Sequence, residues 1–198
     1  MDILTTHIQY EETIKGSRFL SELIPCISQA EAREILKSQK AKYADSTHVV
    51  HAFIVGAGAQ VKGMSDDGEP SGTAGRPTLD VLSGRACTNV ILTITRWFGG
   101  TLLGTGGLVK AYSGGAKGVI AKADEQGAFQ PLVDKTTFIF EADYALLRSI
   151  KNLMESFHFW NVKEEFGTSI TITGEIQSDE KETFSAKLKD LSNGKILL

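Results

Sequence analysis

The feature that most restricts how this chain can fold is a concentration of glycine, since 15 of its 20 glycines lie within residues 56–118. Inside that stretch, residues 88–96 are rich in β-branched side chains and are expected to form a strand. A glycine-rich turn follows at residues 99–107, and a helix is expected over residues 108–123. Three glycines interrupt this helix, and each lowers helix propensity by up to about 1 kcal/mol: Gly114, Gly115 and Gly118. They indicate either close packing of the helix on a sheet or a helix that is merely weak.

Ahead of this stretch, apolar patterning alternates with helix and turn signals. Ser28 is followed three residues later by Glu31, which fits a capping box at the start of a helix. The expected elements are, in order, a strand over residues 15–25, a helix from Ser28 to about Lys40, a strand over 47–55, a loop over 63–75 and a short helix from Pro77 to Gly84. This order predicts an α+β domain.

A second, regular series of elements begins after residues 127–131, which have the composition of a linker. The expected series is a strand over 136–142, a helix capped by Asp143, a hairpin about Gly167, a helix ended by Gly194 and a last strand over 195–198. The order β-α-β-β-α-β is that of the ferredoxin-like split unit. The sequence therefore predicts two domains, residues 1–130 and 131–198.

Composition limits the cellular setting. The net charge is −3, and the N-terminal residues lack a basic segment followed by an apolar run, so no signal peptide is expected. No apolar run approaches the roughly 18 residues of a membrane span. Cys26 and Cys87 are not arranged as a C-x-x-C pair and are expected to be reduced thiols. We expect a cytoplasmic protein without a membrane partner, and the oligomeric state is not indicated.

Positive charge is concentrated in the second half of the glycine-dense stretch. No Asp or Glu occurs between Asp80 and Asp124, and five cations lie in that gap: Arg85, Arg96, Lys110, Lys117 and Lys122. Such a segment forms a positive patch unless acids from elsewhere in the fold cover it. A glycine-rich turn before a helix can hold phosphate on free N–H groups. The spacing fits neither the Walker nor the dinucleotide pattern, so ATP and NAD are weakly supported.

Three carboxylates occur within four residues of the loop before the short helix: Asp66, Asp67 and Glu69. They could hold a hard cation, although Gly68 and the adjacent acids do not fit an EF-hand. The Ser/Gly/Thr run that follows could instead present N–H groups to an anion. In a third interpretation, the acids bond local backbone in a structured turn. We expect no tight metal site.

The aromatic and histidine side chains leave two further alternatives. Trp97 could form a stacking platform for bases or belong to the core, and Phe98 is expected in the core. His48 and His51 are three apart on a strand, so they should face opposite sides and not share one metal. A core histidine and a surface histidine are expected. No catalytic triad is suggested by local sequence.

Two long motifs resemble the signature blocks of the YigZ/IMPACT family. They are Asp-Asp-Gly-Glu-Pro-Ser-Gly-Thr-Ala-Gly-Arg-Pro at residues 66–77 and Arg-Trp-Phe-Gly-Gly through Lys-Ala-Tyr at residues 96–112. Gly-Ser-Arg-Phe at residues 16–19 and Thr-His at 47–48 fit weaker blocks. The resemblance implies an N-terminal domain of the ribosomal-protein-S5 domain-2-like fold and a C-terminal ferredoxin-like domain. It also implies a link to translation, since eukaryotic IMPACT proteins restrain a kinase that responds to amino-acid starvation.

Taken together, these features favour a non-catalytic binding protein associated with translation. Its N-terminal domain would contact RNA or a ribosome-associated protein without a cofactor, a metal or catalytic residues. The candidate contact residues are Arg76, Arg85, Arg96, Trp97, Gly99, Gly100, Gly104, Gly106, Gly107, Lys110 and Lys117. The alternative is an enzyme acting on a small phosphorylated or nucleotide substrate. Asp66, Asp67 and Glu69 would then hold Mg²⁺, and residues 104–107 would hold phosphate.

Overall fold

The computed structural model describes residues 1–198, which divide into two compact units, Met1–Leu132 and Val133–Leu198. The division falls two residues beyond the boundary expected from composition. Each unit has its own hydrophobic core, so each is described by itself. None of the helices combines the length and apolar character that crossing a membrane requires.

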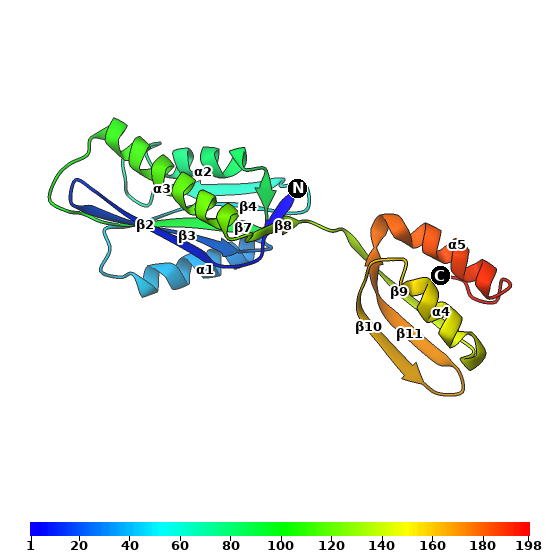
Figure 1. Cartoon of the computed structure of the whole chain (residues 1–198). Helices are drawn as coiled ribbons and strands as arrows, with labels where there is room; N and C mark the ends of the chain where they lie inside the picture. Colours follow the sequence, from blue (N-terminus) through cyan, green and yellow to red (C-terminus); the bar gives the residue numbers. More distant parts are fainter. The chain divides into compact units, whose positions relative to one another are not determined.

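The first unit is built on a five-stranded antiparallel sheet of order β2-β3-β7-β4-β5 (Figure 1). Its strands are β2 (Ile8–Ile14), β3 (Ser17–Pro25), β4 (His48–Val55), β5 (Val61–Ser65) and β7 (Val90–Trp97). β7 is central and buried along nearly its whole length, as its β-branched sequence predicts. The strand β5 lies in part of the stretch that was expected to be loop, so the loop begins only at Asp66.

Helices cover both faces of this sheet (Figure 1). The helices α2 (Gly75–Gly84) and α3 (Thr105–Glu125) enclose the larger core, which includes Phe19, Ile94 and Tyr112. The helix α1 (Gln29–Lys42) covers a smaller cluster that includes Cys26 and Phe53. A short sheet of order β6-β1-β8 completes the unit, with β1 (Asp2–Leu4), β6 (Cys87–Thr88) and β8 (Phe129–Pro131).

The glycines of α3 allow the helix to lie close to the sheet. A Cβ placed on Gly115 would lie 2.6 Å from the Ser21 hydroxyl, and one on Gly118 would lie 2.5 Å from the Tyr10 ring. Neither distance is tolerated between real atoms, so only glycine fits. The prediction that the helix glycines reflect close packing is confirmed for Gly115 and Gly118, but not for Gly114, whose Cβ would lie 3.6 Å from its nearest neighbour.

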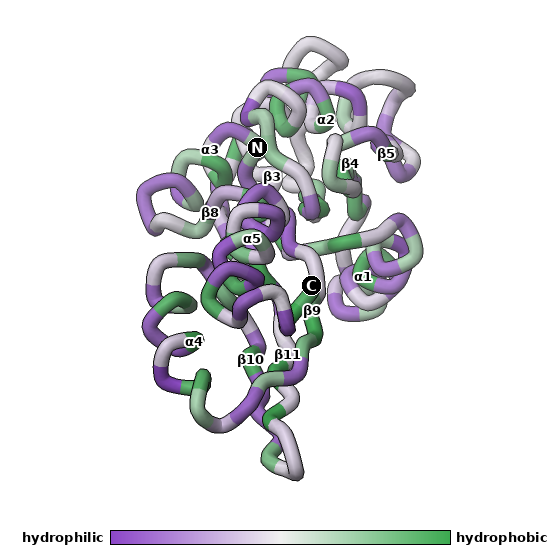
Figure 2. Tube along the Cα trace, turned by 90° about the vertical axis from the view of Figure 1, so that its right-hand side faces the viewer, coloured by the Kyte–Doolittle hydropathy of each residue, from purple (hydrophilic) through white to green (hydrophobic).

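The second unit packs two helices on one face of a three-stranded antiparallel sheet. Its elements are β9 (Lys135–Ala142), a 3₁₀ turn η1 (Tyr144–Leu146), α4 (Leu147–Met154), β10 (Phe159–Phe166), β11 (Ile170–Gln177), a 3₁₀ turn η2 (Ser178–Glu180) and α5 (Lys181–Leu191). The strand order is β10-β11-β9. Figure 2 shows polar and apolar residues alternating around α4 and α5, as expected of helices with one buried side.

The predicted last strand over residues 195–198 is not formed. The Ile196 N–H donates to the Ser192 hydroxyl at 3.0 Å, and the Lys195 N–H donates to the Ser192 carbonyl at 3.2 Å. These local bonds turn the chain after α5 and place Ile196 in the core at 5% exposure. The prediction was wrong because the N–H groups of Lys195 and Ile196 bond Ser192 within a turn and not a neighbouring strand.

Candidate functional site

The loop between β5 and α2 is closed by Asp66. Its carboxylate accepts three backbone N–H groups, from Gly72 at 2.9 Å, Ala74 at 3.0 Å and Gly75 at 2.7 Å. Partial burial opposes ionisation of Asp66, but the three donors outweigh burial and lower its pKa. Asp66 therefore stabilises a structured turn by bonding local backbone, which was one of the three alternatives expected for this loop.

Asp67 ties the same loop to two other elements. Its carboxylate accepts the Val49 N–H of β4 at 2.7 Å and forms an ion pair with Lys40 of α1. The Asp67 carbonyl oxygen lies 2.8 Å from Nδ1 of His48. These contacts hold the loop against β4 and direct the next acid, Glu69, toward the sheet.

Glu69 is the centre of a buried polar cluster. Its Oε1 accepts from Nη1 of Arg96 at 2.7 Å and from the Tyr112 hydroxyl at 2.7 Å, and Nε2 of His48 lies 3.8 Å away. The side chains of Glu69 and Arg96 are 3% and 6% exposed. Burial, with Glu69 as a hydrogen-bond partner, raises the pKa of Tyr112 well above its usual range. Tyr112 is therefore a neutral donor to a buried ion pair.

Arg96 is held by contacts within this cluster and is shielded from solvent. Its Nη2 lies 3.4 Å from the Ser17 hydroxyl, and its Nε is buried without a hydrogen-bond partner. The same Ser17 hydroxyl accepts the Gly99 N–H at 3.1 Å. Gly99 in turn lies so close to the Gly16 backbone that a Cβ would overlap it. Gly99 is therefore required by packing, whatever ligand the protein binds.

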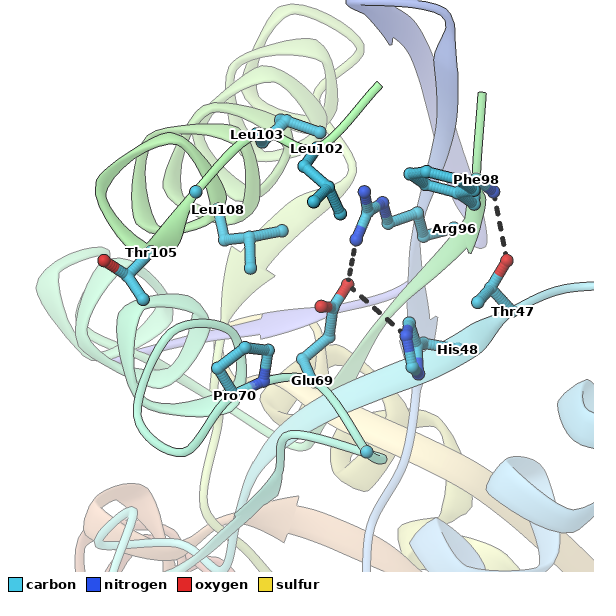
Figure 3. Close-up of a pocket in the computed structure, with 12 residues that line it drawn as sticks. Thr47, His48, Glu69, Pro70, Arg96, Phe98, Leu102, Leu103, Thr105 and Leu108 are labelled. Carbon is cyan, nitrogen blue, oxygen red and sulfur yellow. Dashed lines mark hydrogen bonds and ion pairs between the residues drawn. The ribbon is translucent and has the colours of Figure 1, made fainter. Parts of the chain in front are cut away.

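A pocket of about 430 Å³ opens above the buried cluster (Figure 3). Its lining is formed by Thr47, His48, Gly68, Glu69, Pro70, Arg96, Phe98, Leu102, Leu103, Gly104, Thr105 and Leu108. Two large apolar side chains at its rim are open to solvent, since Phe98 is 46% exposed and Leu102 is 82% exposed. The expectation that Phe98 belongs to the core was wrong. The Phe98 N–H instead donates to the Thr47 hydroxyl at 3.0 Å, which turns the chain out of β7 (Figure 3).

The predicted cations do not come together as one patch. Arg76 pairs with Asp80 at 2.8 Å within α2. Arg85 pairs with Asp2 and Asp124 at 3.0 and 2.9 Å, near the last turn of α3 and not its first. The Glu69–Arg96 pair does the same for Arg96. Acids brought close by the fold therefore neutralise three of the predicted cations.

Two predicted cations have no ion-pair partner and lie along α3. Lys110 and Lys117 are both exposed. Lys110 lines a second hollow of about 400 Å³ with Lys15, Gly106 and Gly107. Gly104 begins the helix with φ at 72°, a backbone conformation that favours glycine. Neither Gly100 nor Gly106 has any atom near the position of a Cβ, so both leave open space beside the turn.

Trp97 is neither a core residue nor a free platform. Its indole N–H donates to Asp45 at 2.9 Å, and the Arg18 guanidinium lies 4.3 Å from the ring centroid. The ring of Tyr43 meets it edge-on at 5.6 Å. Arg18, Tyr43 and Asp45 therefore already hold Trp97 within the first unit.

The two histidines do not form a metal site. His48 lines the pocket, and burial lowers the pKa of His51. Both histidines are partly buried, so the expectation of one core and one surface histidine was wrong. No three His, Cys, Asp or Glu side chains are arranged so that they could hold a metal ion. Sequence reasoning missed His48, Tyr112 and Leu102 as site residues. The Thr-His pair at residues 47–48 was a usable signal for His48, because it lies in one of the weaker motif blocks.

Comparison with known proteins places the chain in a family. Residues 15–120 match the family described as the Impact N-terminal domain, and residues 140–195 match a domain of unknown function, DUF1949. The chain belongs to the IMPACT family.

Its relatives include an IMPACT family member of Haemophilus influenzae, 32% identical over 96% of this chain and 92% of the relative. The IMPACT family member YigZ of Escherichia coli is 34% identical over 94% of this chain and 91% of the relative. YvyE of Bacillus subtilis is 31% identical over 94% of this chain and 84% of the relative.

Solved structures extend the comparison. A crystal structure described as that of a hypothetical protein is 32% identical, with a TM-score of 0.70 over 98% of this chain and 94% of that one. A structure of the two-domain translational regulator Yih1 is 26% identical over 61% of this chain and 46% of that one. Its TM-score of 0.35 is too low to support an argument about function.

Proposed function

We propose that this IMPACT family protein is a non-catalytic binding protein that acts on the translation apparatus. Its recognition surface is the rim of the pocket on the first unit, and its partner is a protein bound to or belonging to the ribosome. The observation that carries the proposal is the exposure of Phe98 and Leu102 above a charge-balanced floor. Exposed apolar side chains around a pocket are typical of surfaces that bind other proteins.

The charges around the pocket favour a protein partner over a nucleic-acid backbone. Phosphate contacts need cations that are free to lose their counterions. Arg96 is buried against Glu69, Arg76 is paired with Asp80, and Arg85 lies near the far end of α3. Lys110 and Lys117 have no ion-pair partner, but neither lines this pocket.

RNA is the second candidate, and Lys15 and Lys110 favour it. Both line the hollow beside the first turn of α3, where free backbone N–H groups add positive potential. Lys117 lies two turns further along the same helix and would extend the contact. In this case the glycines at 104, 106 and 107 would let a phosphate approach the backbone.

An enzyme that uses Mg²⁺ has less support. Asp66 is occupied by three backbone N–H groups, Asp67 by Lys40 and Val49, and Glu69 by Arg96 and Tyr112. A cation would have to displace these partners before it met three carboxylate oxygens. We therefore prefer a binding function to catalysis at this loop.

The finer fold assignments belong to the same proposal. We assign the first unit to the ribosomal-protein-S5 domain-2-like fold and the second to the ferredoxin-like fold without its last strand. The order β10-β11-β9 agrees with the order of a ferredoxin-like sheet that lacks one edge strand. A cytoplasmic setting is supported by Cys26 and Cys87, which are buried free thiols.

Co-sedimentation with purified bacterial ribosomes tests this function. The purified protein is spun through a sucrose cushion with ribosomes at about 50 mM and about 200 mM salt, the range over which phosphate contacts lose most of their strength. We expect the protein to pellet with ribosomes at both salt concentrations, because apolar contacts are not screened by salt.

Two results would contradict the proposal. Absence from the pellet at both salt concentrations would remove the ribosome as the location of the partner. Binding that falls steeply between the two concentrations would favour the RNA candidate at Lys15 and Lys110, since each phosphate contact on a single strand contributes about −0.7 to the log–log slope.

A further inference from the structure

Only one oxygen of the Glu69 carboxylate contacts the groups around it. The contacts from Arg96, Tyr112 and His48 all fall on Oε1. Figure 3 shows the other oxygen turned away from these groups, toward the space between Pro70 and Leu108. A carboxylate oxygen has two acceptor sites and loses free energy when it is withdrawn from water without a donor. The floor of the pocket therefore presents one free, strong hydrogen-bond acceptor.

The charge of that acceptor is already balanced. Arg96 forms an ion pair with Glu69 at 2.7 Å, and Tyr112 is a neutral donor. A lysine or arginine entering the pocket would meet the positive charge of Arg96 as well as the negative charge of Glu69. An anion would meet the carboxylate directly. The group that fits the floor is an uncharged N–H or O–H donor.

The walls of the pocket require an apolar body on that donor. Pro70, Leu102 and Leu108 face the opening in Figure 3, and the ring of Phe98 lies at its edge. The volume of about 430 Å³ is within the range of pockets that hold compact ligands, about 300–1,000 Å³. Tryptophan and tyrosine combine a large apolar body with one polar atom, and both are frequent anchors at protein interfaces.

We propose that the pocket receives a tryptophan or tyrosine side chain of the partner protein, and that its N–H or O–H donates to the free oxygen of Glu69. The inference rests on the proposed function, since it names the group by which the partner is held. The ring packs between Leu102 and Leu108, and its polar edge reaches the floor. Specificity comes from the donor, because an apolar ring without one leaves the Glu69 oxygen buried and unpaired.

The probe is N-acetyl-tryptophanamide, titrated into the full chain and followed by backbone NMR shifts of residues 98–108. A ligand of this size is expected to bind in about the millimolar range. The matched probe is the same compound with a methyl group on the indole nitrogen, which keeps the ring and removes the donor. We expect the methylated probe to bind about tenfold more weakly or worse, the factor of one hydrogen bond to a charged group.

Two variants locate the binding. Leu102→Ala is expected to weaken the tryptophan probe without altering the fold, since Leu102 is 82% exposed. Ile27→Ala is the matched control, because Ile27 is 72% exposed and follows the end of β3 remote from the pocket. It should leave the titration unchanged.

Equal affinity of the two indole probes would overturn the proposal, as would tighter binding of N-acetyl-argininamide. Absence of saturable shifts at residues 98–108 would also overturn it. These failures are distinct from failure of the proposed function. If the protein pellets with ribosomes at high salt but binds both indole probes equally, the proposed ribosomal partner stands. Only the proposed aromatic anchor is then excluded.

Discussion

Removal of the Glu69 carboxylate should destabilise the first unit far more than removal of an exposed carboxylate. Glu69→Ala leaves the Arg96 side chain, which is 6% exposed, without its ion-pair partner. It also removes the acceptor of the buried Tyr112 hydroxyl. Breaking one side of a buried pair typically costs about 3–5 kcal/mol, because the remaining charge stays buried and uncompensated. We expect the free energy of unfolding of the first unit to fall by about that amount.

The assay is urea denaturation followed by tryptophan fluorescence. Trp97 lies in the first unit and Trp160 in the second, so each unit carries one reporter. A Trp160→Phe background leaves Trp97 as the only signal and allows the first unit to be fitted alone. This separation matters because a chain of two units need not unfold in one step.

Two comparisons isolate the cost of leaving a buried charge unpaired. Glu11→Ala removes a partner of Arg18 from a pair whose side chains are about half exposed, and it should cost less than about 1 kcal/mol. Replacing both buried charges, with Glu69→Leu and Arg96→Met together, should recover part of the loss, because no charge is left unpaired while the Tyr112 hydroxyl still lacks its acceptor. A cost of Glu69→Ala no larger than that of Glu11→Ala would show that the buried pair does not stabilise the first unit in this way.

Three further predictions concern the loop, the helix and the linker. The pKa of Asp66 is lowered below 3.8 in the folded state, so its contribution to stability is present above that value and is lost as pH falls through the folded pKa. The stability difference between the wild type and Asp66→Asn should therefore shrink in acid urea titrations, and a constant difference would contradict this. Gly118→Ala should destabilise the protein because its Cβ would lie 2.5 Å from the Tyr10 ring, whereas Gly114→Ala, whose Cβ would lie 3.6 Å from its nearest neighbour, should be neutral or stabilising in thermal melts. Limited proteolysis should cut first within residues 127–135, and a first cut inside α3 would count against the division into two domains.

Local signals in the sequence were read correctly where a few neighbouring residues decide the structure. The Ser28 hydroxyl accepts the Glu31 N–H at 3.1 Å, so the helix starts where the capping pattern predicts. The Glu31 carboxylate accepts from the Ile27 N–H at 2.8 Å, one residue earlier than the capping-box rule states. The strand β7 was likewise evident from its β-branched residues.

Features that depend on distant residues could not be read in the same way. Gly63 suggested a loop, but it lies within β5 opposite Phe53, whose ring covers the glycine and leaves no room for a Cβ. The positive stretch looked open because its acids lie elsewhere in the sequence. Glu69 is 27 residues from Arg96, and Asp2 is 83 residues from Arg85. Only the fold brings these charges together.

The surroundings of the glycine-rich turn differ from those expected for a phosphate site. The glycine-rich turn does lie beside a pocket, as its position between a strand and a helix suggests. The arginine expected to face a ligand became part of the floor, and the phenylalanine expected in the core became part of the rim. The arginine is held inward by the buried Glu69 carboxylate, and the Phe98 N–H donates to the Thr47 hydroxyl where the chain leaves β7.

The most direct test of the central claim compares two double variants in the ribosome co-sedimentation assay. Phe98→Ala with Leu102→Ala removes the apolar rim, and Lys15→Ala with Lys110→Ala removes the unpaired cations beside α3. All four side chains lie at or near the surface, so the fold should survive in both variants, which matched thermal melts would verify. We expect the rim variant to stay in the supernatant at about 200 mM salt, while the lysine variant still pellets with ribosomes. Loss of binding in the lysine variant alone, with the rim variant unaffected, would contradict it.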